Sequence, residues 1–230
     1  MPSRDSFCDS IGYKAFIIDE IPSTNTFLKN NHHNYSDKTV LIANKQTMGR
    51  GRFNRVWKSD DDICFSILYK NKDIYTIITP LAIVYALKEL GIESAIKWPN
   101  DIYVNNKKLS GILIEDIYNN SFIASVVGVG INIFNKDEFN GIGLCNFINI
   151  NKNEVILNIL KYIIQLQSIS QKKLIDLYKR NNMVINKKIS YKGKIYYAYD
   201  ITENGHLVIK NNDETLIVTG SEIDIKNSLL

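Results

Sequence analysis

In the middle of the chain, hydrophobic residues have the spacing of a strand, then of a helix, and then of several further strands. Residues 63–69, ICFSILY, form a β-rich run, and the following IYTIITPLAIVYALKEL has the apolar spacing of a helix. Gly91 follows that stretch and predicts the end of the helix, because glycine readily adopts the left-handed conformation found there. Four extended runs come next, AIKW, DIYV, KLSGILIED and SFIASVVGVGINIF, separated by the turn sequences PN, NNK and YNNS. This pattern predicts an antiparallel meander at the centre of the protein.

The second half of the chain shows helical spacing again and then a series of short strands. Residues 154–167 and 171–180 are amphipathic and are expected to cover one face of the sheet. Beyond them, short β-rich runs alternate with glycine- and asparagine-containing turns. We therefore predict an α+β fold. A mixed, mainly antiparallel sheet covered by helices occupies residues 1–182, and a small SH3-like β-barrel occupies residues 183–230.

Composition limits the size of the protein and the kind of partner it has. A chain of 230 residues with 45% hydrophobic content is long enough for one good core and a small second module. The balance of 28 basic against 24 acidic residues, without a lysine or arginine block, argues against a nucleic-acid partner. Cys8, Cys64 and Cys145 are widely spaced and indicate neither a disulfide framework nor a zinc site.

The N-terminal residues lack the apolar core of a signal peptide, and no apolar run reaches the roughly 20 residues of a membrane span. We therefore expect a cytoplasmic protein without a membrane partner.

Three of the five arginines lie in one short segment, residues 49–57, which reads GRGRFNRVW. Alternating glycine and arginine is unfavourable in the interior of a helix or strand, so this segment is predicted to be a mobile loop. Arg50, Arg52 and Arg55 would bring planar guanidinium groups to an anion, together with backbone N–H groups. A carboxylate, a phosphate or a nucleic acid would each satisfy this pattern.

Two further segments carry polar side chains at turns. In KWPNDIYVNNKKLSGILIE, residues 97–115, a turn at Pro99 and Asn100 places Lys97 and Asp101 at the end of one strand, and Lys108 begins the strand opposite. A plain surface hairpin with exposed lysines is the alternative interpretation.

In IPSTNTFL, Ser23 or Thr24 is expected to cap a helix. The same hydroxyl groups are also suited to a neutral polar ligand such as a urea-like group, whose N–H and C=O must be paired once they leave water.

Taken together, these segments resemble the biotin protein ligases over most of residues 20–135. The matching motifs are STN at 23–25, QTMGRGRFNRVW at 46–57, KWPNDIYVNNKKLSGILIE at 97–115 and GVGINI at 128–133. The resemblance implies the fold shared by biotin ligases and class II aminoacyl-tRNA synthetases. About 20 residues precede the STN cluster, so a monofunctional form without an N-terminal DNA-binding domain is expected. Lipoate ligases, which share the fold but lack KWPND, are the second choice.

The resemblance also implies roles for individual residues. Those expected to contact biotin are Ser23, Thr24, Asn25, Gln46, Gly49, Arg50, Gly51, Arg52, Lys108 and Gly111. Those expected to contact the nucleotide are Arg52, Arg55, Trp57, Lys97, Asn100 and Asn132. Arg50, Lys108 and Asp101 are the expected catalytic residues. Trp57 stands where a loop meets a strand, and on that ground alone packing is favoured over ligand contact.

The implied activity has two half-reactions: biotin and ATP form biotinyl-5′-AMP, and a lysine of a biotin carboxyl carrier protein then accepts the biotin. ATP and Mg²⁺ are the expected cofactors, and Asp101 is expected either to bind Mg²⁺ or to accept the proton of the attacking lysine. The carrier would be a subunit of acetyl-CoA carboxylase or a similar protein, and the enzyme a monomer or homodimer. The alternatives are a lipoate or octanoate ligase and a nucleic-acid-binding protein.

Overall fold

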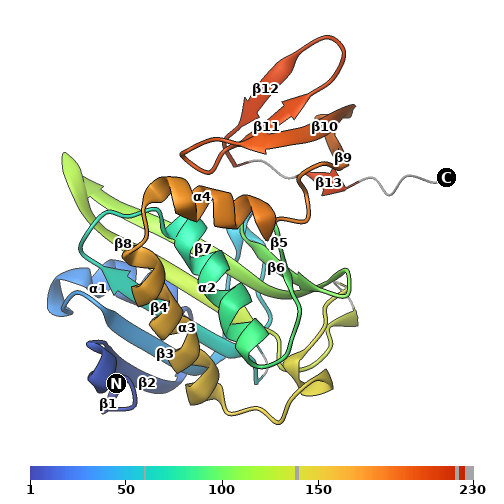
Figure 1. Cartoon of the computed structure of the whole chain (residues 1–230). Helices are drawn as coiled ribbons and strands as arrows, with labels where there is room; N and C mark the ends of the chain where they lie inside the picture. Colours follow the sequence, from blue (N-terminus) through green and yellow to red (C-terminus); the bar gives the residue numbers. More distant parts are fainter. Residues whose placement is uncertain (60, 138–139, 221–222, 226–230) are drawn as a thin grey trace.

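The computed structural model describes residues 1–59, 61–137, 140–220 and 223–225, and Figure 1 shows a large sheet covered by helices with a smaller sheet beside it. The strand order of the large sheet is β1-β2-β3-β4-β8-β7-β6-β5. Its strands are β1 (Ser3–Asp5), β2 (Lys14–Ile21), β3 (Thr39–Gln46), β4 (Ile63–Tyr69), β5 (Ala95–Lys97), β6 (Asp101–Val104), β7 (Lys107–Asn119) and β8 (Ser121–Ile131). β2 and β3 pair in parallel, and the other described pairs of this sheet are antiparallel. The predicted mixed sheet and its central meander are confirmed.

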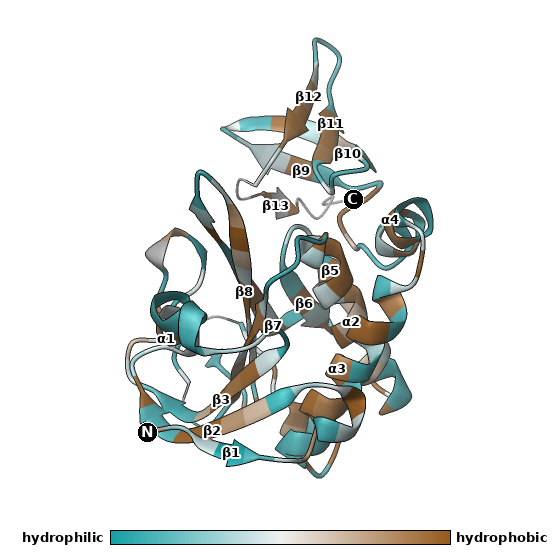
Figure 2. Ribbon diagram, turned by 90° about the vertical axis from the view of Figure 1, so that its left-hand side faces the viewer, coloured by the Kyte–Doolittle hydropathy of each residue, from teal (hydrophilic) through white to brown (hydrophobic). Residues whose placement is uncertain are grey.

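The two faces of the large sheet belong to two hydrophobic clusters, because successive side chains of a strand point to opposite sides. Leu41 and Leu68 pack with Leu28 of helix α1 (Thr24–Asn31). Val40 and Ile67 point the other way and belong to the larger cluster, which includes helix α2 (Tyr75–Glu89). Figure 2 shows α2 as mostly hydrophobic and α1 as mostly hydrophilic. The larger cluster is therefore the main core, and α1 covers the second face with a thinner layer.

The helices begin and end close to where the sequence predicts. Gly91 has a φ of 77° and lies just after the last turn of α2, as expected for a helix-ending glycine. Helix α3 (Lys152–Gln167) begins two residues before the predicted start at residue 154, because the side chain of Asn151 caps it. Asn151 accepts a hydrogen bond from the Glu154 N–H at 3.3 Å. Helix α3 packs along α2, and helix α4 (Gln171–Arg180) follows it. No helix in the described part of the chain has the length and apolar content to cross a membrane.

The C-terminal strands form a second antiparallel sheet in the order β12-β11-β10-β9-β13. They are β9 (Lys188–Tyr191), β10 (Lys194–Ile201), β11 (Leu207–Lys210), β12 (Thr215–Val218) and β13 (Asp224–Ile225). The predicted SH3-like barrel is not confirmed, because no ladder among these described strands joins β12 to β13. Residues 221–222 and 226–230 of the predicted barrel lie outside the described residues.

The small sheet and the large sheet share one hydrophobic core. Ile189 and Ile209 of the small sheet belong to the same buried cluster as the residues of α2. At the contact, the indole N–H of Trp98 donates to the carbonyl of Gly205 at 2.9 Å. The boundary predicted between residues 182 and 183 thus joins two modules that are packed together, and their independence as domains remains a prediction.

Candidate active site

A cavity of about 650 Å³ lies beside α1 on the large sheet, a volume typical of a small-molecule site. It gathers fifteen of the residues that the sequence nominates. They are Ser23, Thr24, Asn25, Gln46, Arg50, Gly51, Arg52, Arg55, Trp57, Lys97, Asn100, Asp101, Lys108, Gly111 and Asn132. The exception is Gly49, which is buried and whose carbonyl accepts a hydrogen bond from the Trp57 N–H at 2.8 Å.

One wall of the cavity is a chain of neutral polar groups at the start of α1. Ser23 caps the helix, as predicted, by accepting a hydrogen bond from the Thr26 N–H at 3.3 Å. The Oε1 atom of Gln46 accepts hydrogen bonds from the backbone N–H of Thr24 at 2.8 Å and from the Thr24 hydroxyl at 3.1 Å. The hydroxyl of Ser66, which the sequence did not single out, lies 2.6 Å from Thr24 Oγ1 and 2.6 Å from Asn25 Oδ1. This polar wall offers fixed donors and acceptors without a net charge.

The floor beneath the cavity is made of glycines on β7 and β8. Gly111 and Gly130 face each other in register, and the Trp57 ring lies against both. A Cβ atom would stand 2.5 Å from the ring at Gly130 and 3.2 Å from it at Gly111. At Gly128, a Cβ atom would stand 2.2 Å from Asn25 Oδ1. Trp57 therefore packs on the sheet, as its place in the sequence predicts, and also lines the cavity.

The other end of the cavity carries the charged residues of the 97–115 hairpin. Lys108 Nζ lies 2.7 Å from Asp101 Oδ1, and both side chains are partly exposed, at 30% and 23%. Asn100 accepts a hydrogen bond from Arg52 NH1 at 3.2 Å, while its own amide donates to the Ile112 carbonyl at 2.7 Å. The predicted turn thus brings Asp101, Asn100 and Lys108 to one place.

Asn132 is buried and braces the backbone beside this charged end. Its side-chain nitrogen donates to the carbonyls of Lys108 at 3.0 Å and Ile142 at 3.3 Å. The amide nitrogen is thereby used inside the protein, and the predicted contact of Asn132 with a nucleotide remains a prediction.

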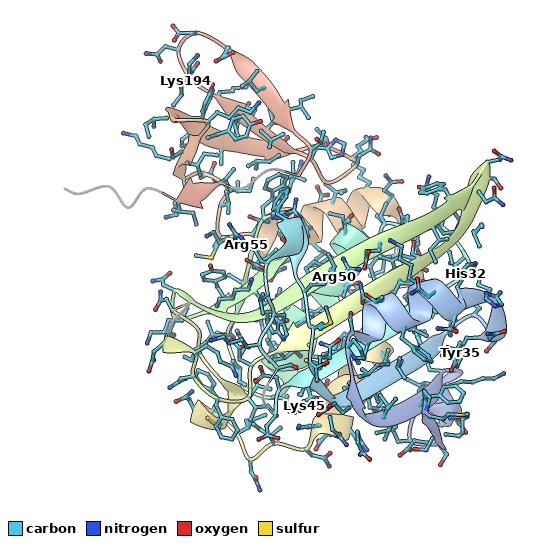
Figure 3. The ribbon with its side chains drawn as sticks, turned by 180° about the vertical axis from the view of Figure 1, so that it is seen from behind. His32, Tyr35, Lys45, Arg50, Arg55 and Lys194 are labelled. Carbon is cyan, nitrogen blue, oxygen red and sulfur yellow. The ribbon has the colours of Figure 1, made fainter. Side chains whose placement is uncertain are left out.

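The arginine segment is a narrow, hairpin-like loop. Arg50 and Val56 form an isolated antiparallel bridge, and the Gly51 N–H donates to the Arg55 carbonyl at 2.7 Å. Phe53, at the tip, has a φ of 55° and is 62% exposed. Figure 3 shows Arg55 at the outer end of this loop and Arg50 closer to α1. The predicted mobility of the loop and its closure over a ligand remain predictions.

Sequence reasoning missed Glu115, the acidic partner of the loop. Both of its carboxylate oxygens accept hydrogen bonds from Arg50 NH2, at 2.9 and 2.8 Å. Lys29 and Asn25 also donate to this carboxylate, each at 3.1 Å. Burial acts to raise the pKa of Glu115, but the hydrogen bonds from Arg50, Asn25 and Lys29 outweigh it and hold the pKa below its ordinary value. Glu115 ends the quoted KLSGILIE motif, and only this position hinted at a role.

Three further contributors to the cavity were also missed. Lys136 lines the cavity and lies 3.2 Å from the buried Asp62, whose other oxygen accepts the Ile133 N–H at 2.9 Å. Ile223 lines the cavity from the C-terminal module, and the Gly220 carbonyl accepts a hydrogen bond from Arg52. No sequence motif marks these residues, because they reach the site through contacts between distant segments.

Burial disfavours thiolate chemistry at Cys64, the buried cysteine beside the cavity. Burial raises the pKa of Cys64 to about 12, although hydrogen bonds with Trp57, Gln46 and Ser59 act in the opposite direction. The thiol therefore stays protonated at neutral pH, and a thiol is a poor nucleophile in that form. The charged groups that line this cavity are arginine, lysine and aspartate side chains.

Comparisons with known proteins agree with one another. Residues 17–132 match the model of the Biotin/lipoate A/B protein ligase family. The bifunctional ligase/repressor BirA of Bacillus subtilis is 38% identical over 113 residues, which cover 44% of this chain and 34% of that protein. The biotin--[acetyl-CoA-carboxylase] ligase of Mycobacterium tuberculosis is 25% identical over 214 residues, covering 81% of this chain and 79% of that protein.

Solved structures extend the similarity to almost the whole chain. The biotin protein ligase from Aquifex aeolicus in complex with biotin and ATP superposes with a TM-score of 0.76 at 26% identity, covering 93% of this chain and 99% of that one. The chain spans about a third of the length of several curated relatives that it matches.

Proposed function

The chain belongs to the biotin/lipoate A/B protein ligase family, and from that premise we propose that it joins biotin to a carrier protein at the expense of ATP. In the first half-reaction biotin and ATP give biotinyl-5′-AMP and pyrophosphate. In the second, a lysine of a biotin carboxyl carrier protein takes the biotin and AMP leaves. The observation that carries the proposal is one cavity with an uncharged polar wall at one end and Lys108, Asp101 and Asn100 at the other.

The polar wall is suited to the ureido ring of biotin. That ring has N–H donors and a carbonyl acceptor and no charge, so its groups must be paired with neutral partners when they leave water. Ser23, Thr24 and Gln46 supply such partners. The Trp57 ring and the glycine strands supply an apolar surface for the rest of the molecule. A charged wall would favour an ionic ligand instead.

Adenylation requires two anions to meet. The biotin carboxylate attacks the α-phosphorus of ATP, and the bond to the pyrophosphate leaving group breaks. Lys108 and Arg52 would stabilise the charge that develops on the phosphate oxygens, because preplaced cations act most strongly in a site from which water is excluded. Asp101 lies 2.7 Å from Lys108 and would hold it in position until the ligands arrive.

Mg²⁺ is proposed to enter this site with ATP, since the cation would neutralise phosphate charge when bound. Asp101 is the one acidic side chain among the described residues that line the cavity, and no group of three or more His, Cys, Asp or Glu in the same part of the chain is placed to hold a metal. A single carboxylate fits an ion held mainly by phosphates and water.

The transfer step needs a neutral lysine from the carrier protein. Its nitrogen attacks the acyl carbon of the mixed anhydride, the bond to AMP breaks, and the ammonium proton must be removed. Asp101 is the proposed acceptor of that proton, as the carboxylate lining this cavity. Besides its contact with Lys108, Asp101 therefore has two candidate roles, Mg²⁺ binding and proton acceptance, which the experiment described below separates.

The two alternative functions fit less well. A nucleic-acid surface would leave the loop arginines facing outward, but Arg50 is paired with Glu115 and Arg52 with Asn100 inside the cavity. For lipoate or octanoate, the polar wall would face an apolar chain and leave its hydrogen-bonding groups without partners.

Remaining features of the proposal concern the whole protein. We place it in the cytoplasm on the ground of its three free cysteines, and we propose that the C-terminal sheet belongs to an SH3-like barrel that forms a second domain. The protein would act as a monomer or homodimer.

The deciding experiment is ATP–pyrophosphate exchange with the purified protein. Biotin should support exchange, whereas lipoate and octanoate should not. A carrier protein and radiolabelled biotin then test the transfer step. Exchange with lipoate or octanoate alone would replace biotin with those acids. Tight, salt-sensitive binding of nucleic acid without any exchange would reject the ligase function.

A further inference from the structure

We infer that Glu115 is a positioning residue that anchors the root of the arginine loop through Arg50. The inference rests on the proposed function only where it concerns biotin. Both Glu115 oxygens bind Arg50 NH2, at 2.9 and 2.8 Å, and the Glu115 side chain is only 14% exposed. The same Arg50 nitrogen also reaches the Thr26 hydroxyl at 3.4 Å. One arginine of the loop is thereby tied to β7 and α1.

The ion pair with Glu115 gives Arg50 a different role from Arg52, although the two arginines are neighbours in the Gly-Arg repeat. The charge of Arg50 is matched by Glu115, so its guanidinium holds the loop in place. Arg52 lies two residues further on and bonds Asn100, at the charged end of the cavity. We therefore assign ligand contact at that end to Arg52 and anchoring to Arg50, while the expected catalytic role of Arg50 remains a prediction.

Glu115 also sets the direction of the hydrogen bonds in the polar wall. An ionised carboxylate only accepts hydrogen bonds, so Asn25 must turn its nitrogen toward Glu115 and its oxygen toward Ser66. The two distances, 3.1 Å to Glu115 and 2.6 Å to the Ser66 hydroxyl, agree with that orientation. Ser66 then donates to Asn25, and the single proton of the Thr24 hydroxyl is available to the Ser66 oxygen at 2.6 Å or to Gln46 Oε1 at 3.1 Å. One carboxylate thus orders both the loop and the wall that faces the ligand.

The Glu115→Gln substitution tests this role because it keeps the shape of the side chain and removes the charge. The neighbouring Asp116→Asn is a matched control: Asp116 lies on the same strand, is exposed and bonds the Ser125 hydroxyl at 2.6 Å, outside the cavity. The first readout is chymotrypsin cleavage after the exposed Phe53 in the ligand-free protein, with the fragments identified by mass spectrometry. We expect cleavage to be about 10-fold faster in Glu115→Gln, as for the loss of one charge-assisted hydrogen bond, and unchanged in Asp116→Asn.

The second readout is the kinetics of biotin-dependent exchange. The KM for biotin should rise about 10- to 100-fold in Glu115→Gln while kcat changes much less. The reason is that the arginine loop and the polar wall would be less well ordered for binding biotin, whereas Lys108 would stay in place. A merely structural role would lower the melting temperature and the amount of active enzyme and leave KM unchanged.

A double-mutant cycle tests whether Glu115 positions the loop through Arg50. Arg50→Ala should speed cleavage after Phe53 as Glu115→Gln does, and the double variant should be no worse than either single one. Additive effects, or equal cleavage rates and KM values in Glu115→Gln and the wild type, would overturn the inference. If Glu115→Gln does not fold, Arg50→Lys gives the same comparison from the other partner. A wild type without biotin-dependent exchange would refute the proposed function, while the ligand-free cleavage result would still decide the role of Glu115.

Discussion

At the scale of single residues, each charged side chain in the cavity depends on the partner it has in the folded chain. Lys108 is paired with Asp101, Arg50 with Glu115, and Lys136 with Asp62. Asp62 is fully buried, whereas Asp101 and Lys108 are partly exposed. A partly exposed pair costs little to break, so a ligand can recruit Lys108 at low cost.

Lys108→Ala should abolish adenylate formation and leave the fold intact. Loss of a preplaced cation at a reacting phosphate costs about 10²- to 10³-fold in rate, whereas removal of a partly exposed side chain changes stability by less than about 1 kcal/mol. Exchange assays and thermal unfolding measure the two effects. The exposed neighbour Lys107 provides the control, and Lys107→Ala should keep full activity. Near-normal synthesis of biotinyl-AMP by Lys108→Ala would remove Lys108 from the mechanism.

Asp101→Asn separates the two roles proposed for this carboxylate. If Asp101 accepts the lysine proton, the variant should form adenylate at a normal rate and transfer biotin about 10²-fold more slowly, the usual size of a general-base effect. If Asp101 helps to bind Mg²⁺ or to hold Lys108, adenylation itself should fall, and added Mg²⁺ should restore it only in the first case. Single-turnover measurement of each half-reaction decides. Unchanged rates in both would show that Asp101 has no catalytic role.

The stability contributed by Glu115 should depend on pH in a defined direction. Its pKa is lowered from the ordinary 4.5 by the hydrogen bonds that overcome its burial, so the native state favours the charged form. The contribution is fully present above pH 4.5 and is lost as the pH falls through the lower folded pKa. Urea unfolding measured from pH 7 to pH 3 should show that the free energies of unfolding of the wild type and Glu115→Gln approach each other as the pH falls. A constant difference over this range would contradict the shift.

At the scale of elements, β7 and β8 make room for the site because they carry glycines, which have no side chains, beneath it. Their pairing places Gly111 opposite Gly130, and the missing side chains leave space for Trp57 and for the cavity. Glycine weakens a strand because it packs nothing. The neighbouring strands and the larger core on the opposite face compensate, so a floor without side chains is held by well-packed residues such as Val127 and Val129.

Gly130→Ala should displace Trp57 and weaken the protein. The new methyl group would stand 2.5 Å from the ring, and overpacking of this kind costs about 1–3 kcal/mol. The melting temperature should fall by about 2–4 °C per kcal/mol, and the KM for biotin should rise. Adding Trp57→Phe makes room for the methyl group and should recover part of the stability without recovering the KM. An unchanged melting temperature in Gly130→Ala would mean that Trp57 moves away freely.

At the scale of the whole molecule, the two sheets share one hydrophobic core. Ile201 and Leu207 of the small sheet lie in the same cluster as Ile77 and Ile78 of α2, and Gly205 stands close to the Ile77 side chain. Burial of each such side chain is worth about 1.5–3 kcal/mol. Contact between the two sheets therefore contributes to the stability of both.

Deletion of residues 186–230 should accordingly destabilise the catalytic sheet as well as removing Ile223 from the cavity. The truncated chain should lose its cooperative thermal transition and expose α2 to solvent, which soluble yield and calorimetry measure. Ile217→Ser is the matched control in the same module, because Ile217 is 61% exposed and its loss should be neutral. A truncation that melts like the full chain and still binds biotin would show two independent domains.

The sequence by itself determined the local features of this protein. Apolar spacing predicted the strands and helices, and the 97–115 hairpin brought the Lys108 side chain to Asp101 because short turns fix the pairing of neighbouring strands. The glycines and arginines of the loop predict an anion site from consecutive residues alone, and that site remains a prediction. Fifteen of the nominated residues line one cavity.

Only the tertiary structure decided which distant residues meet. Arg50 and Glu115 are 65 positions apart in the chain, and nothing local to either one selects the other. Their contact depends on the register of the large sheet and on the packing of α1, which are set by the sum of many weak interactions over the whole core. The same reason explains why Lys136, Ser66 and Ile223 could not be found in the sequence, and why two predicted modules share one core.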